Sequence, residues 1–90
     1  MKVKYFAILR DITKKKEEDW PEPEATVGDL IRDLVVRYGH AFERWVMKDG
    51  DLWALVIILV NGHDVRNLKR FATALSPDDV VVIFPPMGGG

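Results

Sequence analysis

The sequence predicts an α+β domain of two layers, in which one main helix packs on a mixed sheet of four to five strands. Three observations lead to this expectation: a strand-like start, one clear amphipathic helix, and two β-branched runs in the second half. A helix with one apolar face and a sheet with an apolar face bury these surfaces against each other, which gives two layers. At 90 residues the chain is most simply a single domain, 1–90.

Composition excludes several classes of protein. The chain is 48% hydrophobic and 30% charged, which is typical of a globular domain and argues against disorder. Thirteen basic and fourteen acidic residues give a net charge of −1, so we expect neither a nucleic-acid nor a membrane partner. The absence of cysteine excludes disulfides and thiolate chemistry and suits a reducing cytoplasm. The start is too charged for a signal peptide, and no apolar run is long enough to cross a bilayer.

The first part of the chain predicts a strand, a turn, a charged loop and at most a short strand at the edge of the sheet. Residues 2–8 alternate and then become apolar, which indicates a strand that runs into a short turn at 9–13. Residues 14–19 are all charged, and we expect a solvated loop or hairpin tip there. Prolines within 20–24 cannot donate to a sheet, so a strand in that segment is short and lies at an edge.

The clearest element is a helix over residues 27–38. Thr26 occupies the N-cap position, and Asp29 follows three residues later, as in a variant of the capping box. Apolar residues recur at steps of three and four, and Gly39 supplies the stop. A shorter amphipathic segment covers residues 40–48 and ends in a turn.

The second half predicts three more strands. Residues 52–60 are apolar and β-branched, which favours a strand that is buried on both faces and ends in an Asn-Gly hairpin turn. Residues 63–75 predict a shorter strand, then a turn or one-turn helix that buries Leu68, Phe71 and Leu75. The final strand, 80–84, is apolar throughout and should lie inside the sheet. This order of elements fits a β-grasp, or ubiquitin-like, roll.

No set of residues in the sequence predicts an active site. His40 and His63 are far apart and lack metal-ligand spacing, so we expect two exposed histidines and no metal site. None of the glycine clusters leads into a helix that could bind phosphate. The three tryptophans are expected in the core or at its rim, not as platforms for bases: Trp20, Trp45 and Trp53.

The carboxyl terminus has a different character from the rest of the chain. Residues 85–90 read Pro-Pro-Met-Gly-Gly-Gly and predict an extended, flexible tail after the last strand. Its last four residues span at most about 13–14 Å, enough to carry the terminal carboxylate into a narrow channel on another protein. Glycine suits such a channel because the partner closes around bare backbone. A frayed end is the alternative, but the rigid Pro-Pro spacer after a buried strand favours a function.

These residues resemble the MoaD/ThiS family of ubiquitin-like sulfur carriers, most closely its MoaD branch, the small subunit of molybdopterin synthase. The ending is similar to the family's Phe-Pro-Pro, an apolar residue, a small residue and Gly-Gly, with Gly88 at the small position. The start "VKYFAILRD", the helix "TVGDLIRDL", the turn "VNG" and the closing "LSPDDVVVIFPP" also resemble the family. One departure is residues 77–79, Pro-Asp-Asp, where Gly-Asp is usual.

The resemblance implies a carrier that is not an enzyme on its own and binds no cofactor. A ubiquitin-activating-type (MoeB-like) enzyme would use ATP to adenylate the Gly90 carboxylate, and a persulfide donor would convert it to a thiocarboxylate. A MoaE-type large subunit would then use that sulfur to build molybdopterin. In this scheme Gly90 carries the sulfur, and the residues that thread into the partner are Phe84, Pro85, Pro86, Met87, Gly88 and Gly89. By the same resemblance, Phe6 and Arg10 lie near the partner interface.

Other functions remain open from the sequence. The same activated glycine could form isopeptide bonds with lysines, as in the similar archaeal small modifiers, which the longer middle of this chain also resembles. The sulfur could instead serve thiazole or cysteine synthesis, or the chain could be an interaction domain with an inert tail. The sequence leaves open the destination of the sulfur, the oligomeric state, and whether the terminus is natural or processed.

Overall fold

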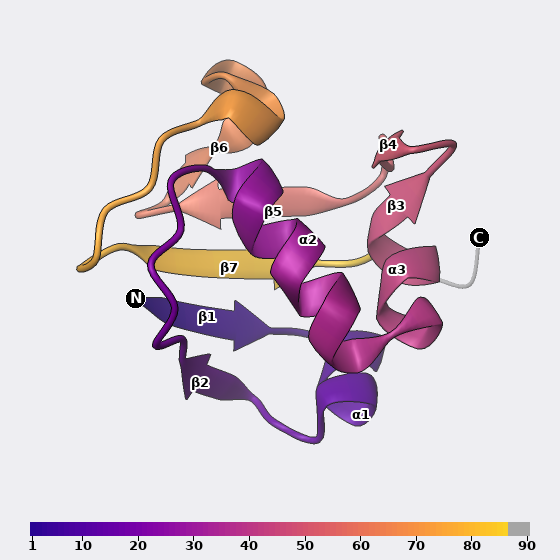
Figure 1. The fold of residues 1–90 in the computed structure, drawn as a ribbon. Helices are drawn as coiled ribbons and strands as arrows, with labels where there is room; N and C mark the ends of the chain where they lie inside the picture. The colour runs from indigo at the N-terminus through magenta and orange to yellow at the C-terminus, as the bar shows by residue number, and fades with distance from the viewer. Residues whose placement is uncertain (87–90) are drawn as a thin grey trace.

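The computed structural model describes residues 1–86, and its framework is a five-stranded mixed sheet (Figure 1). The strand order is β2-β1-β7-β5-β6, with β1 and β7 parallel and the other neighbours antiparallel. The last strand therefore lies at the centre, as the sequence predicts. The strands are β1 (Lys2–Tyr5), β2 (Glu17–Asp19), β5 (Ile57–Val60), β6 (His63–Asp64) and β7 (Val80–Phe84).

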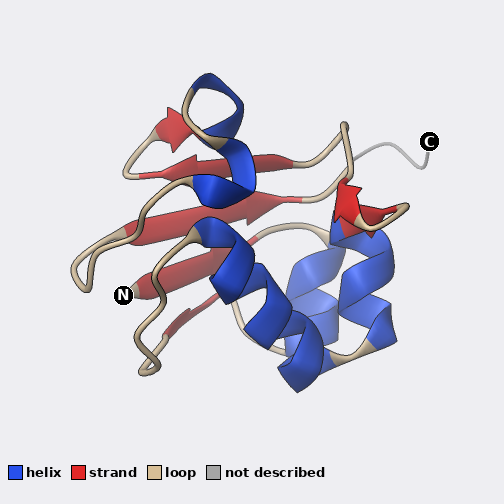
Figure 2. Ribbon diagram, turned by 45° about the horizontal axis from the view of Figure 1, so that its top comes forward, coloured by secondary structure: helices blue, strands red, loops and turns tan. Residues whose placement is uncertain are grey.

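Helices cover one face of this sheet and leave the other face open (Figure 2). They are α1 (Ile8–Thr13), α2 (Val27–Tyr38) and α3 (His40–Val46), with two 3₁₀ turns, η1 (Val65–Asn67) and η2 (Arg70–Ala72). A small hairpin, β3 (Met47–Lys48) and β4 (Asp51–Leu52), follows α3. The expected α+β class is confirmed, with three α-helices where the sequence predicts one main helix. No helix in residues 1–86 is long and apolar enough to cross a membrane.

The core lies between α2 and the inward face of the sheet. Thr26 caps α2 as predicted, since its hydroxyl accepts a hydrogen bond from the Asp29 backbone N–H at 3.2 Å. Alternate residues of the central strands are buried, while their neighbours point to the open face. The buried residues of these elements are Val3, Tyr5, Val27, Leu30, Ile31, Leu34, Ile58, Val60, Val81 and Ile83.

The first part of the chain differs from the prediction in two places. The first strand ends at Tyr5 and not at residue 8, and α1 stands where the sequence predicts only a turn. The edge strand is made by part of the charged run, residues 17–19, and not by 20–24. Trp20 instead turns inward and is 3% exposed, so the proline-containing segment after it leaves the sheet.

The long apolar run after the hairpin also differs from the prediction. Within this run Leu52 ends the small strand β4, and only Ile57–Val60 join the main sheet, where one face is open because Ile57 is 44% exposed. Before it, the carbonyls of Trp53 and Ala54 accept hydrogen bonds from the Arg66 guanidinium at 3.0 and 2.7 Å, which holds that segment in a turn. Leu68, predicted to be buried, is 47% exposed, whereas Phe71 and Leu75 pack against the core.

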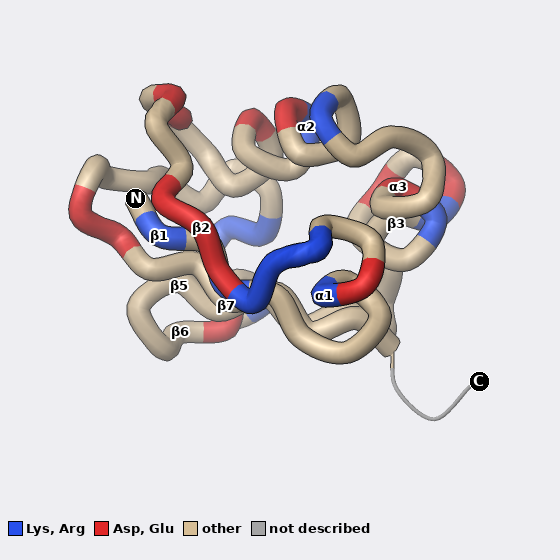
Figure 3. The backbone as a smooth tube through the Cα atoms, turned by 90° about the horizontal axis from the view of Figure 1, so that it is seen from below, with Lys and Arg blue, Asp and Glu red and all other residues tan. Residues whose placement is uncertain are grey.

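A buried carboxylate joins the edge strand to the helix layer. Glu18 accepts hydrogen bonds from the hydroxyls of Tyr5 and Tyr38 and forms an ion pair with Lys15 at 3.1 Å. Burial opposes ionisation of this carboxyl, but the hydrogen bonds from Tyr38, Tyr5 and Lys15 outweigh it and hold the pKa of Glu18 below its usual value. The acidic strand β2, with the basic run before it, is visible in Figure 3.

This network predicts a pH-dependent contribution to stability. Because the pKa of Glu18 is lower in the folded protein, its contribution is complete above the ordinary value of 4.5 and is lost as the pH falls through the folded value. We expect Glu18→Gln to lower the free energy of unfolding by about 1–3 kcal/mol at neutral pH, since hydrogen bonds to a charged group are lost. The difference from wild type should shrink in acid, where the wild-type carboxyl is also neutral. Urea titrations at both pH values measure it.

The matched control is Glu17→Gln on the same strand. Glu17 is exposed and pairs only with Lys2 in the described residues, so this variant should unfold nearly like wild type. If both variants lost equal stability at neutral pH, the buried network would not have the role given to Glu18.

Candidate functional site

The candidate site lies at the carboxyl end of β7, where the described chain finishes. Phe84 is the last residue of the strand and pairs with Ile57 of β5. Pro85 is buried and Pro86 is half-buried, so the chain is still held by the fold at its last described residues. Any group after residue 86 therefore starts from a fixed point at one end of the sheet.

An aromatic stack marks this end of the strand. The rings of Phe6 and Phe84 stack with centroids 4.4 Å apart and planes 20° apart. The guanidinium of Arg10 lies over the ring of Phe6, 4.5 Å from its centroid. Three residues from β7, from the end of β1 and from α1 therefore form one half-exposed surface beside Pro85.

The chain between β1 and α1 sets the geometry of this stack. Ala7 adopts φ 53° and ψ −133°, which turns the backbone sharply after Phe6. The turn lets α1 fold back, and the Arg10 Nε then donates to the Tyr5 carbonyl at 2.8 Å. That bond uses one of the five guanidinium donors, and the terminal nitrogens of Arg10 form no ion pair within residues 1–86.

An apolar strip continues from the stack across the open face of the sheet. Ile57, at 44% exposure, lies opposite Phe84, and Leu59 lies opposite Val82 in the same register. These side chains point away from the helix layer, because their neighbours along each strand are buried beneath it. Such a strip, continuous with the aromatic stack, has the character of a docking surface.

The structure brings together five of the residues that the resemblance implicates: Phe6, Arg10, Phe84, Pro85 and Pro86. The other four, Met87, Gly88, Gly89 and Gly90, lie outside the described residues. Sequence reasoning missed Ile57 as part of this surface. The apolar run around it has no alternation, and only the pairing with β7 reveals which of its side chains face outward.

The histidines are exposed and the tryptophans lie in the core or at its rim, as predicted. His40 and His63 are both exposed, and residues 1–86 contain no cluster of three metal-ligating side chains. Trp20 is buried, and its Nε1 donates to Glu24 at 2.8 Å. Burial raises the pKa of the Glu24 carboxyl, with the neighbouring Asp33 acting in the same direction and the Trp20 hydrogen bond opposing it. Trp45 and Trp53 pack at the rim of the core.

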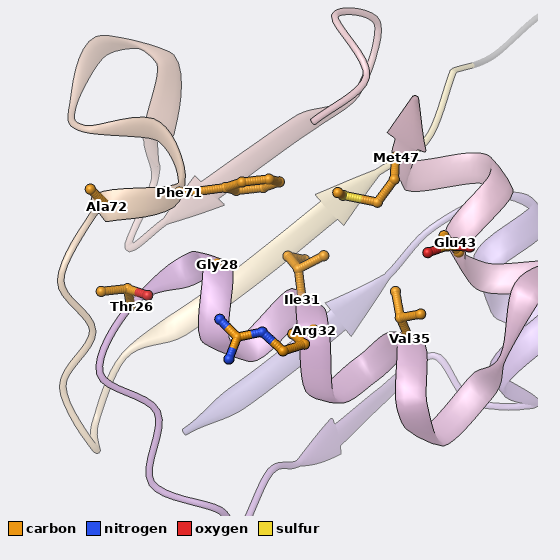
Figure 4. A pocket seen from close by; sticks show the side chains of 9 residues that line it. All are labelled: Thr26, Gly28, Ile31, Arg32, Val35, Glu43, Met47, Phe71 and Ala72. Carbon is orange, nitrogen blue, oxygen red and sulfur yellow. The ribbon is translucent and has the colours of Figure 1, made fainter. Parts of the chain in front are cut away.

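A cleft of about 490 Å³ lies on the helix layer, away from the stack (Figure 4). Its polar side chains are already paired at the rim: Arg32 with Asp29 at 3.0 Å, and Glu43 with His40 at 3.4 Å. The titratable side chains among its lining residues are these two paired ones, Arg32 and Glu43, which do not form a nucleophile–base pair. The residues that line it are Thr26, Gly28, Ile31, Arg32, Val35, Glu43, Met47, Phe71 and Ala72.

The class of ubiquitin-like β-grasp proteins has this architecture, a mixed sheet with the last strand at its centre and one layer of helices. In this chain an aromatic stack lies at the end of that last strand. The model of the ThiS family matches residues 3–90, and the chain belongs to that family. Small archaeal modifier protein 3 of Haloferax volcanii is 36% identical, covering 100% of this chain and 98% of that protein. The sulfur carrier protein CysO of Mycobacterium tuberculosis is 39% identical over 67 residues, 72% of each chain.

Solved structures agree with this fold. The small archaeal modifier protein 1 of Methanosarcina acetivorans has a TM-score of 0.84 at 32% identity, covering 99% of this chain and 94% of that one. A chain of the BexX/CysO complex of Amycolatopsis orientalis gives a TM-score of 0.82 at 28% identity, with coverage of 99% of this chain and 98% of that one. A Pyrococcus furiosus protein described as a putative molybdopterin converting factor, subunit 1, gives 0.73 at 37% identity, with coverage of 96% and 95%. The predicted β-grasp roll and family are confirmed. Proteins of this kind are small carriers that are generally not catalytic.

The aromatic stack predicts a measurable coupling between two distant positions. Removing either ring, in Phe6→Ala or Phe84→Ala, should destabilise the protein, and the double variant should lose less than the sum of the two. We expect a coupling energy of about 0.5–1.5 kcal/mol, because stacked rings contribute this much beyond their buried area. Urea unfolding of the four proteins gives the cycle. Additive losses would contradict a direct contact between the rings.

Proposed function

We propose that this protein carries sulfur as a thiocarboxylate on Gly90. The carboxylate attacks the α-phosphorus of ATP on a partner enzyme, which forms an acyl-adenylate and releases pyrophosphate. A persulfide sulfur then attacks the acyl carbon and AMP leaves. A thiol cleaves the resulting acyl disulfide, which leaves the thiocarboxylate on Gly90 and a disulfide on the donor side. ATP is thus a substrate of the partner, and this chain contributes the reacting carboxylate.

The observation that supports this proposal most is the placement of the chain end. The terminus follows the central strand of the sheet, with a Pro-Pro spacer and an aromatic stack at the point of exit. A partner can therefore bind the aromatic stack while residues 87–90 enter its active site. We propose residues 85–90 as this threading segment, on the single domain 1–90.

The surface around the stack is the proposed docking site for the activating enzyme. Phe6 and Phe84 would pack against apolar side chains of the partner. The terminal N–H groups of Arg10 would donate hydrogen bonds to an acceptor on the same partner surface. We propose an adenylating enzyme of the MoeB type and a persulfide donor as partners, acting in the cytoplasm, where the ATP and the reducing conditions that this chemistry needs are available.

For the destination of the sulfur, we propose molybdopterin synthesis, with this chain as the small subunit beside a MoaE-type subunit. The 37% identity to the Pyrococcus furiosus protein supports it. The complex would be a sulfurtransferase in which the partner holds the catalytic groups and this chain supplies the sulfur.

A second candidate function is protein modification through Gly90. The supporting observation is the similarity to small archaeal modifier protein 3, which extends over 100% of this chain. Here a lysine amine would displace AMP from the acyl-adenylate and form an isopeptide bond. Both functions use the same activated terminus, so only the acceptor distinguishes them.

Deletion of Gly90 should abolish thiocarboxylation and leave the fold intact. Wild-type protein incubated with ATP, the activating enzyme and a persulfide donor should gain the mass of one oxygen exchanged for sulfur at the terminus. The deletion should show no such gain and should melt at the wild-type temperature, because it removes no residue of the described fold. An unchanged wild-type mass with an active partner present would refute the carrier function.

The destination requires a separate experiment. Thiocarboxylated protein mixed with a MoaE-type subunit and the cyclic pterin precursor should form a dithiolene product. Mass spectrometry of proteins from cells that express a tagged copy tests the alternative, since isopeptide remnants on lysines appear only if the chain is a modifier. Remnants without any pterin product would favour the second function over the first.

A further inference from the structure

Three cations share one arrangement at the same end of the molecule. Arg10 lies over Phe6 at 4.5 Å, Arg44 over Trp45 at 5.9 Å, and Lys48 over Trp53 at 5.5 Å. Within residues 1–86 none of these three cations forms an ion pair, whereas six other Lys and Arg side chains do; Lys4, Lys14, Lys16 and Lys69 also form none, but they lie over no aromatic ring. We call Arg10, Arg44 and Lys48 the cationic rim. A contact with the face of an aromatic ring attracts a cation but does not neutralise its charge.

The rim surrounds the end of β7 from which the tail continues. Arg10 belongs to α1, which follows the strand paired with β7 and contacts α3, the helix of Arg44. On the other side, Ile57 pairs with Phe84, and the segment before Ile57 returns to α3, because the Trp53 N–H donates to the Val46 carbonyl at 2.9 Å. Figure 1 shows α1, α3 and β3 together at this end of the sheet.

The opposite end of the sheet is acidic. The turn before β7 carries Asp78 and Asp79, and the Asp79 carbonyl accepts from the Lys2 N–H at the start of β1. Glu22 and Glu24 line a hollow with Met1 and Pro77 at the same end. At the end that presents the tail, the three cations lie among the carboxylates of Asp11, Glu43, Asp49 and Asp51, of which Glu43 and Asp51 are paired with His40 and Arg70.

We infer that the cationic rim docks on a ring of carboxylates around the entrance of the partner protein's channel. This inference rests on the proposed function, because it names the chemistry of the surface that receives the tail. The cations of the rim, which form no ion pair within residues 1–86, would pair with acidic side chains of the partner around the bound stack. Charges at the edge of an interface act mainly on the rate of association and on its salt dependence.

Activation kinetics test the inference directly. Pyrophosphate exchange by the activating enzyme should show a KM for this protein that rises with ionic strength, while kcat stays constant. The double variant Arg44→Gln/Lys48→Gln should raise KM about two- to tenfold and flatten the salt dependence, as expected for two exposed charge pairs. Lys69→Gln is the matched control, since Lys69 is exposed, forms no ion pair in the described residues, and lies between η1 and η2.

The outcomes separate this inference from the proposed function. If wild type is activated and the rim variant behaves like Lys69→Gln at all salt concentrations, the acidic partner surface is wrong and the carrier function stands. A fall in kcat at unchanged KM would also contradict a docking role. If wild type is not activated at all, the carrier proposal fails. A second experiment then tests whether the rim binds acidic side chains.

That experiment uses hexaglutamate as a probe and the three indole N–H signals in NMR as reporters. The signals of Trp45 and Trp53 should shift on titration and return in roughly 0.5 M salt, where the Debye length is only a few ångströms. Trp20 is the internal control, because it is 3% exposed and bonded to Glu24 at the acidic end. Equal shifts of all three signals, or none, would overturn the inference. An oligouridylate of equal charge that bound about tenfold tighter would point to RNA and overturn it as well.

Discussion

The structure depends on the pairing of the last strand at the centre of the sheet. β7 pairs in parallel with β1 and antiparallel with β5, so the sheet cannot form before the end of the chain has been placed. The same pairing fixes Phe84 between the ends of two neighbouring strands. A chain end is usually the least ordered part of a domain, but here it follows directly from the most deeply held strand. The fold therefore holds Pro85 and Pro86, the last described residues, beside the aromatic stack.

The two faces of the sheet have different roles, since one supplies the buried core and the other is open to a partner. The inward face buries alternate residues of every central strand under α2 and supplies the core. The open face keeps an apolar strip that costs solubility and adds little to stability, which is the balance expected of a surface with a partner. The exposed edge strand β2 is short and all acidic, which disfavours pairing with a strand of another molecule. The buried carboxylate of Glu18 joins this strand to the helix layer.

The sequence predicts most of the framework and part of the candidate site. The helix 27–38, its cap at Thr26 and the central last strand follow from periodicity and capping, which are local signals. The sequence does not predict the edge strand at 17–19, because its pairing with β1 is a tertiary effect and an all-charged run has no apolar alternation. It predicts a strand buried on both faces over 52–60, but the Arg66 hydrogen bonds to two carbonyls hold the start of this run in a turn, and nothing local encodes that contact. Phe6 and Arg10 came from a family resemblance, and only the fold places them against Phe84.

The distribution of charge adds a property that composition conceals. A net charge of −1 led to the expectation of no strong field, and for nucleic acid or lipid at long range that argument still applies. Within one Debye length, about 8–10 Å, what matters is which charges are already paired. Six Lys and Arg side chains of the described residues form an ion pair with a carboxylate, whereas the cations of the rim lie over aromatic rings. A ring contact orders a cation without neutralising it, so the charge stays available to a partner. In the docking that we propose, the apolar stack would supply affinity and the cations of the rim would pair with the partner's acidic side chains.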